Sequence, residues 1–190
     1  EYNPEKAREL LLEAGFTEAD LEAGISVGTL TTYGAATGEK AKAAQVIQSN
    51  LKDVGLICEV EVADASIITP RLKAQDYDLG IYGDSGNFDF NNIRQQVHSE
   101  SEGTQVIKYR DENSCVDWER VEELCDLGVG TTDVEQRKQY YTELWSIIAE
   151  SATIFPYLHM PVCVVWSDDL NIDKAQLCPT YYHLYDFSWQ

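Results

Sequence analysis

The stretch between residues 25 and 82 constrains the fold most, because strand-like and helix-like segments alternate along it with short connections. The segment from Ile25 to Tyr33 is rich in β-branched residues and is followed by Gly34. From Glu39 to Val54 the apolar residues recur at helical spacing, and strand-like sequence resumes from Leu56 to Val62. This order predicts a strand, a crossover helix and a second strand.

A second crossover of similar length follows the first. Asp64 can cap a helix that reaches about Ala74, with Pro70 either as an irregularity inside this helix or as its true beginning. An apolar run from Tyr77 to Tyr82 then predicts a third strand. Crossovers of this length join parallel strands with right-handed connections, so the three strands should share one sheet. The predicted fold class is α/β, with a mainly parallel sheet flanked by helices.

The third predicted strand continues into a loop with carboxylate, amide and aromatic side chains, in which Gly83 and Gly86 permit a sharp turn. Ligands of open α/β sheets bind outside the carboxyl ends of the strands, which is where this loop should lie. The loop therefore suits a cationic, hydrogen-bonding ligand group, and a surface turn with capping residues is the alternative interpretation. The candidate ligand-binding residues are Tyr33, Tyr82, Asp84, Asn87, Phe88 and Asp89.

Helices are also predicted on either side of this stretch. Asn3 and Pro4 suit the cap and the first position of a helix that Gly15 closes. Thr132 and Glu135 have the spacing of a capping box. Further helices are expected at residues 90–98, 117–127 and 134–152, and an edge or crossing strand interrupted by Pro156 and Pro161 is expected at residues 154–166.

The charge of the chain excludes several classes of partner. Its 33 acidic residues against 14 basic ones give a formal net charge of −19, so phosphate backbones and anionic lipid surfaces should be repelled. We therefore expect no nucleic-acid partner. No run approaches the roughly 18 apolar residues of a membrane helix, and the sequence opens without a basic-then-apolar signal segment. The 44% hydrophobic content is enough for a substantial core in a single domain.

The cysteines and histidines do not form a recognisable chemical site. The five cysteines include no C-x-x-C pair and are interpreted mainly as buried thiols, although one bridge, for example from Cys115 to Cys125, remains open. His98, His159 and His183 are far apart and lack metal-ligand spacing. We therefore expect neither a metal nor a cofactor.

Sequence motifs for catalysis are also absent. The sequence contains no phosphate-binding, dinucleotide-binding, nucleophile-elbow or zinc-protease motif. Acid and base chemistry by Asp84 and Asp89 is the remaining enzymatic alternative, and it rests on two carboxylates in a chain with 33 of them. We therefore expect the protein not to be an enzyme.

Four segments resemble one known family. The run from Tyr2 to Phe16, YNPEKARELLLEAGF, closely resembles the YNPEKAKELLAEAGY-type segment of the bacterial dipeptide and oligopeptide substrate-binding proteins of ABC importers. The segments at 44–56, 74–79 and 133–157 resemble, in turn, the "iqaqLkevGi", "gdyDl" and "eerkalY…iPly" segments of that family. The resemblance therefore covers nearly the whole chain.

This resemblance implies both a fold and a function. It implies a type II periplasmic-binding-protein lobe, with residues 1–190 as a single C-terminal ligand-binding lobe and the N-terminal lobe absent from this chain. The implied protein is a monomeric, extracytoplasmic solute-binding component, located in the periplasm or anchored as a lipoprotein. It would deliver a short peptide to the permease subunits of an importer. Relatives that carry nickel chelates, sugars or other solutes provide the alternative ligand class.

The resemblance also assigns a role in the loop. In dipeptide-binding members the strand ends in a G-W-T-G-D-N-G-D-P-D-like loop whose first Asp receives the α-ammonium group of the ligand. The segment from Gly80 to Asp89 aligns with it without a gap, so that role would fall to Asp84. Ile81, Asn87 and Phe88 replace the Trp, an Asp and the Pro of that loop.

Overall fold

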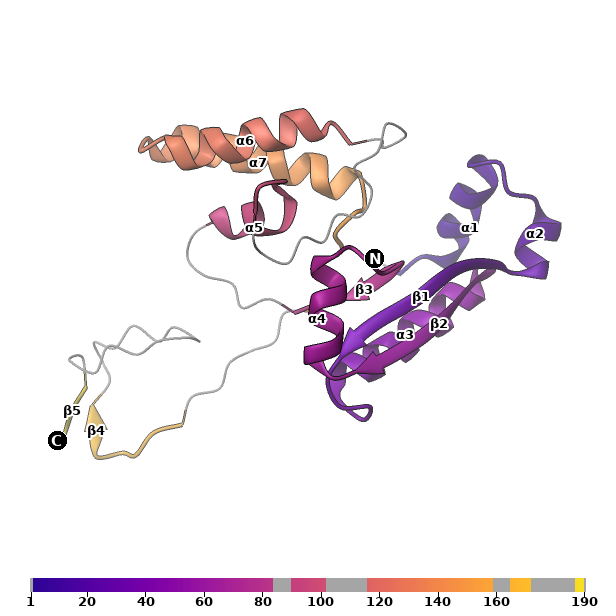
Figure 1. Ribbon diagram of the computed structural model, residues 1–190, viewed down its shortest axis with the longest axis horizontal. Helices are drawn as coiled ribbons and strands as arrows, with labels where there is room; N and C mark the ends of the chain where they lie inside the picture. Colours follow the sequence, from indigo (N-terminus) through magenta and orange to yellow (C-terminus); the bar gives the residue numbers. More distant parts are fainter. Residues whose placement is uncertain (1, 84–89, 102–115, 159–164, 172–186, 190) are drawn as a thin grey trace.

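The structure is a computed structural model that describes residues 2–83, 90–101, 116–158, 165–171 and 187–189. Figure 1 shows the arrangement of its elements. A sheet region contains α1 (Pro4–Glu13), α2 (Glu18–Ala23), β1 (Ile25–Tyr33), α3 (Glu39–Asp53), β2 (Leu56–Ala63), α4 (Ala65–Lys73) and β3 (Leu79–Ile81). A helical region contains η1 (Phe90–Ile93), α5 (Arg94–Val97), α6 (Trp118–Gly130) and α7 (Val134–Glu150), and a short ribbon pairs β4 (Leu170–Asn171) with β5 (Ser188–Trp189).

The sheet has the strand order β2-β1-β3, and β1 is parallel to both neighbours. The crossover from β1 to β2 and the crossover from β2 to β3 therefore run in opposite directions across the sheet. Because both are expected to be right-handed, their helices must cover opposite faces. The packing agrees: Ala44 of α3 joins the core with Leu30 and Ile81, whereas Ile68 and Leu72 of α4 form a second core beside Tyr33.

A bulge in β1 adjusts the register between this strand and β2. Pairing shifts between Ser26 and Thr29, and Gly28 inside the bulge has a φ of +81°. The Asp78 carboxylate accepts a hydrogen bond from the backbone N–H of Thr29 at 3.0 Å, and a Cβ on Gly28 would lie 2.2 Å from that carboxylate. Glycine is required here because of both its conformation and this close approach.

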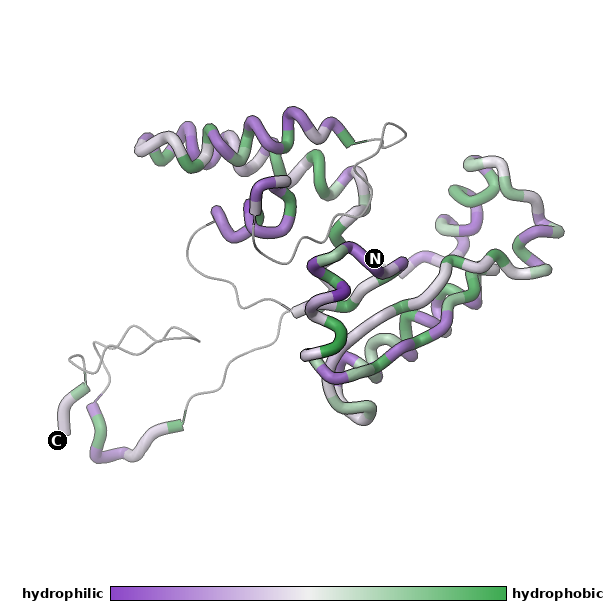
Figure 2. Tube along the Cα trace, in the orientation of Figure 1, coloured by the Kyte–Doolittle hydropathy of each residue, from purple (hydrophilic) through white to green (hydrophobic). Residues whose placement is uncertain are grey.

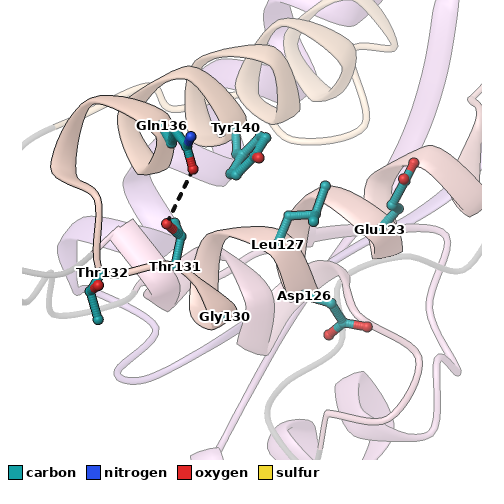
Figure 3. A pocket seen from close by; sticks show the side chains of 8 residues that line it. All are labelled: Glu123, Asp126, Leu127, Gly130, Thr131, Thr132, Gln136 and Tyr140. Carbon is teal, nitrogen blue, oxygen red and sulfur yellow. Dashed lines mark hydrogen bonds between the residues drawn. The ribbon is translucent and has the colours of Figure 1, made fainter.

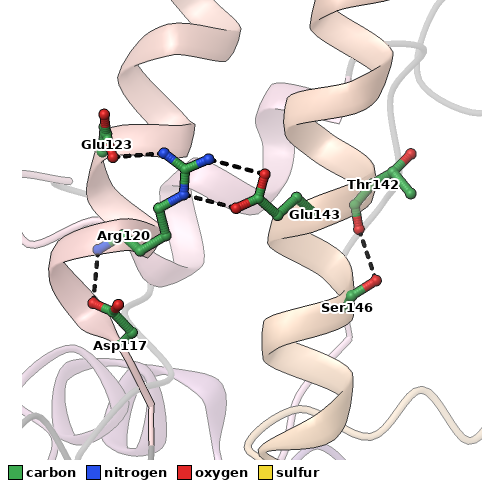
Figure 4. A network of polar contacts seen from close by, with 6 residues as sticks. All are labelled: Asp117, Arg120, Glu123, Thr142, Glu143 and Ser146. Carbon is green, nitrogen blue, oxygen red and sulfur yellow. Dashed lines mark hydrogen bonds and ion pairs between the residues drawn. The ribbon is translucent and has the colours of Figure 1, made fainter.

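The helix pair, α6 and α7, has its own core. Leu124 and Leu144 are fully buried between the two helices, and Trp118 and Trp145 pack against the same cluster. Figure 2 shows apolar and polar residues alternating along both helices, as expected when one side of each is buried. Outside this core, the Arg120 guanidinium donates to both carboxylate oxygens of Glu143, at 2.7 and 2.9 Å (Figure 4).

Most predicted elements are confirmed. The predicted α/β class, the three strands and the helices near residues 4, 39, 65, 118 and 134 are all present. The helix after Asp64 begins at Ala65 and contains Pro70, so the alternative that it begins near Pro70 is wrong. The Asp64 side chain caps it by accepting from the Ser66 N–H at 2.8 Å.

Three expectations need correction. The predicted Thr132 capping box is wrong, because Asp133 Oδ1 accepts from the N–H groups of Glu135 and Gln136 at 2.9 and 3.0 Å. A carboxylate is favoured over a hydroxyl at the positive end of a helix. The third strand is confined to Leu79–Ile81. The helical prediction for residues 90–98 is confirmed, with a 3₁₀ helix at Phe90–Ile93 followed directly by α5. Within 154–166, the described residues 154–158 and 165–166 belong to no strand.

Across the described ranges, we found no helix that is both long and apolar enough to cross a membrane. Cys58 and Cys125 are buried, in agreement with their interpretation as small apolar side chains, and burial raises the pKa of the Cys58 thiol. Cys115, Cys163 and Cys178 lie outside the described residues.

Candidate solute-binding edge of the parallel sheet

The carboxyl ends of β1 and β3 meet at one edge of the sheet. Thr32 pairs with Ile81 in the ladder, and its buried hydroxyl donates to the Ile81 carbonyl oxygen at 3.2 Å. The next residue along the chain from each of these two is a half-buried tyrosine: Tyr33 ends β1, and Tyr82 directly follows β3. The rings of Tyr33 and Tyr82 are tilted by 58°, with their centroids 6.1 Å apart. The sheet therefore brings together two residues that are 49 positions apart and that were both predicted for the site.

The Tyr33 hydroxyl also contacts the chain beyond β3. It donates a hydrogen bond to the carbonyl oxygen of Gly83 at 3.4 Å. This contact ties the end of β1 to the beginning of the loop that follows β3. The remaining predicted site residues, Asp84, Asn87, Phe88 and Asp89, lie outside the described residues.

Lys40 is part of this edge, and sequence reasoning missed it. It lies in the first turn of α3, and its Nζ is 3.5 Å from the centroid of the Tyr33 ring. Its aliphatic stem approaches Gly83 closely, since a Cβ on that glycine would lie 3.3 Å from Lys40 Cε. A lysine in the first turn of a helix has no sequence signal of its own. Only the return of the chain from Tyr33 to α3 places its ammonium group over the ring.

Charged groups on the α4 side of the sheet are paired with one another. Arg71 donates to Glu61 at 2.7 Å and to Asp76 at 3.2 Å, and the buried Thr31 hydroxyl lies 3.5 Å from the same Glu61 oxygen. Hydrogen bonding to Glu61, followed by attraction to both carboxylates, raises the pKa of Arg71 above its ordinary value. These contacts give Glu61 in β2, and Asp76 in the connection between α4 and β3, a structural role.

The helix pair has a separate hollow at its turn (Figure 3). Its volume is about 610 Å³, and it is open to solvent. Its walls are acidic or neutral, and Thr131 Oγ1 contacts Gln136 Oε1 at 3.5 Å across it. None of the residues predicted for a ligand lines it. The lining residues are Glu123, Asp126, Leu127, Gly130, Thr131, Thr132, Gln136 and Tyr140.

Metal-ligand geometry is not found in the described part of the chain, where no group of three or more His, Cys, Asp or Glu side chains could hold an ion. His98 is buried, and its Nε2 lies 3.4 Å from Asp126 Oδ1. Burial of the imidazole shows that His98 is a core histidine. His159 and His183 lie outside the described residues.

In a parallel α/β sheet with helices on both faces, ligands bind outside the carboxyl ends of the strands, which is where Tyr33 and Tyr82 meet. Residues 1–102 match the family described as "Bacterial extracellular solute-binding proteins, family 5 Middle". This match covers more than half of the 190 residues, so the chain belongs to family 5 of the bacterial extracellular solute-binding proteins.

A curated relative supports the same family. Di/tripeptide-binding protein 2 of Pseudomonas aeruginosa is 34% identical over 92 residues. The aligned part covers 46% of this chain and 16% of that protein. The chain therefore corresponds to a small part of the curated relative that it matches.

Solved structures share the fold. HbpA2 from Haemophilus parasuis has a TM-score of 0.72 at 20% identity, over 100% of this chain and 36% of that one. The oligopeptide-binding protein AppA from Bacillus subtilis, in complex with a nonapeptide, has a TM-score of 0.63 at 22% identity. NikZ from Campylobacter jejuni, in complex with Ni(L-His), has a TM-score of 0.63 at 19% identity. The matches to AppA and to NikZ each cover 80% of this chain and 31% of the solved chain.

Proposed function

We propose that the chain forms the C-terminal ligand-binding lobe of a two-lobed solute-binding protein, and that this protein captures a short peptide and delivers it to the permease of an ABC importer. Residues 1–190 would constitute this single lobe. The protein would act outside the cytoplasm as a monomer, in the periplasm or as a membrane-anchored lipoprotein. It would bind its solute without catalysing a reaction.

One observation carries this proposal: Tyr33, Tyr82 and Gly83 are joined at the carboxyl edge of the sheet, immediately before the loop that contains Asp84. This is the edge where open α/β sheets bind ligands. Aromatic rings beside a carboxylate suit a peptide, because they can pack against its side chains while the carboxylate receives its ammonium group. We assign that last role to Asp84, with Asn87, Phe88 and Asp89 as further ligand contacts.

A non-peptide solute is the second candidate. Structural neighbours with the same fold include a nickel–histidine complex and the mannohexaose-bound oligopeptide-binding protein of Thermotoga maritima. Mass spectrometry of the molecule that co-purifies with the full protein would separate the two ligand classes.

The role of Asp84 can be tested in the full protein by calorimetric titration with a peptide that binds the parent. Removing the charge in Asp84→Asn leaves a ligand ammonium unpaired, which should cost about 2 to 5 kcal/mol of binding free energy. The affinity should therefore fall at least tenfold. Asp89→Asn is the control in the same loop, and its effect should be smaller. An unchanged affinity in Asp84→Asn would refute the assignment.

A further inference from the structure

Lys40 has a position that the stability of α3 does not explain. It lies in the first turn of a 15-residue helix, where the partial positive charge of the helix dipole disfavours a basic side chain. Among the lysines that the structure describes, Lys40 is partly buried and the others are exposed. Because this lysine is partly dehydrated at the end of a helix that disfavours a positive charge, an interaction outside α3 must offset both costs.

The surroundings of Lys40 hold its ammonium group at the sheet edge. The face of the Tyr33 ring lies 3.5 Å below Nζ, and the absence of a side chain at Gly83 leaves room for the lysine stem. The Tyr33 ring is itself held by its hydrogen bond to the Gly83 carbonyl oxygen. The cation thus lies over the Tyr33 ring at the sheet edge rather than fully extended into solvent.

The ring satisfies only part of what an ammonium group requires. A cation over an aromatic face gains electrostatic attraction, yet its N–H groups still need hydrogen-bond acceptors. Within the described ranges, no carboxylate oxygen lies within ion-pair distance of Lys40 Nζ, although Arg71, Arg94 and Arg120 all have acidic partners. Glu39 is adjacent in sequence, but neighbouring helical residues do not face each other.

We propose that Lys40 receives a carboxylate group of the bound solute and thereby selects solutes that carry one. This proposal rests on the proposed function, since it places the solute at the same sheet edge. Lys40 is then a specificity-determining residue: it binds the carboxylate, and Tyr33 positions its ammonium group. A peptide has two sources of this group, the C-terminal carboxylate and an acidic side chain.

Isothermal titration of the full protein with alanine peptides of two to five residues tests this role. Each peptide is used as a free acid, as an amide, and as an amide with one alanine replaced by glutamate. The parent should bind a free acid roughly tenfold more tightly than its amide, as expected for a hydrogen bond to a charged group. Recovery of affinity in the glutamate amide would identify the side-chain carboxylate as the preferred source.

Lys40→Met keeps the length of the side chain and removes its charge, so it should abolish the preference for the carboxylate. Lys40→Arg should retain most of that preference. Lys42→Met makes the same charge change at an exposed position of α3 and should leave the preference intact. Equal thermal unfolding of all three variants and the parent would show that the comparison concerns binding.

The outcomes separate this proposal from the function on which it rests. One outcome is that free acids bind the parent while Lys40→Met either lowers the affinities for acids and amides equally or changes neither. In that case Lys40 does not receive the carboxylate, and the proposed peptide function stands. If no peptide in the series binds the parent, the proposed peptide function fails together with the role of Lys40.

Discussion

The sheet region and the helix pair differ in what they bury. At the end of β1, Thr31 and Thr32 are fully buried polar residues, and their hydroxyls contact Glu61 and the Ile81 backbone. The helix pair buries Leu124 and Leu144 and keeps its charged Arg120 at the surface. A buried hydroxyl is costly unless it is bonded, so polar interior positions mark where the backbone must be fixed. The sheet region fixes the carboxyl edge that we propose as the ligand site, whereas the helix pair is built for packing.

The largest expected effect comes from emptying the core of the helix pair. Leu144→Ala removes a fully buried side chain and should lower the free energy of unfolding by about 2 to 5 kcal/mol. Tryptophan fluorescence during urea unfolding measures this, because all four tryptophans lie at residue 118 or later. Solute affinity should not change, since this core shares no buried residue with the cores of the sheet region. A loss of solute affinity in the folded variant would contradict the independence of the sheet edge from the helix-pair core.

The bulge in β1 should be the next most sensitive feature. Gly28→Ala combines an unfavourable positive φ with a Cβ that meets the Asp78 carboxylate. It should lower the free energy of unfolding by about 2 to 4 kcal/mol. Circular dichroism in urea measures the loss. Gly15→Ala is the matched control, because Gly15 has a φ of +101° and no atom within 4 Å of its added Cβ. If both variants lose the same stability, the contact with Asp78 has no role in fixing the bulge.

The ion pair between α6 and α7 should give the smallest effect, and that effect should depend on pH. Hydrogen bonding to Arg120 lowers the pKa of the Glu143 carboxyl group (Figure 4). A lowered carboxyl pKa stabilises the folded state above the unfolded-state pKa, which is about 4.3 for glutamate, and this stabilisation is lost as pH falls through the folded-state pKa. The free energies of unfolding of the parent and of Arg120→Met should therefore differ slightly at pH 7 and become equal in acid. A difference that grows in acid would contradict this assignment.

The sequence was informative wherever local physics decides the structure. β-branched and apolar runs located the strands, and helical periodicity located the long helices. Asn3, Asp64 and Pro4 located helix starts that the structure confirms. Local rules failed where two neighbouring groups compete. Thr132 and Asp133 can both cap α7, and spacing does not reveal that the carboxylate prevails. The six-residue α2 was missed because it is too short for periodicity, although Thr17 and Asp20 form a capping box there.

The candidate site was predictable only in part. Parallel pairing placed Tyr33 beside Tyr82 because Tyr33 ends β1 and Tyr82 directly follows the end of the neighbouring β3, and this follows from topology. Lys40 could not be found in this way, since its contact with Tyr33 depends on how the chain turns between β1 and α3. Predictions for Asp84, Asn87, Phe88 and Asp89 stay predictions.

Amide hydrogen exchange, with and without a saturating bound peptide, tests the central claim that the solute binds at the sheet edge. In the full protein, the account predicts slower exchange on binding at residues 32–42 and 79–83, around Tyr33, Lys40 and Tyr82. Residues 126–136, around the hollow of the helix pair, should exchange as before. Protection confined to residues 126–136, with none at the sheet edge, would contradict the account.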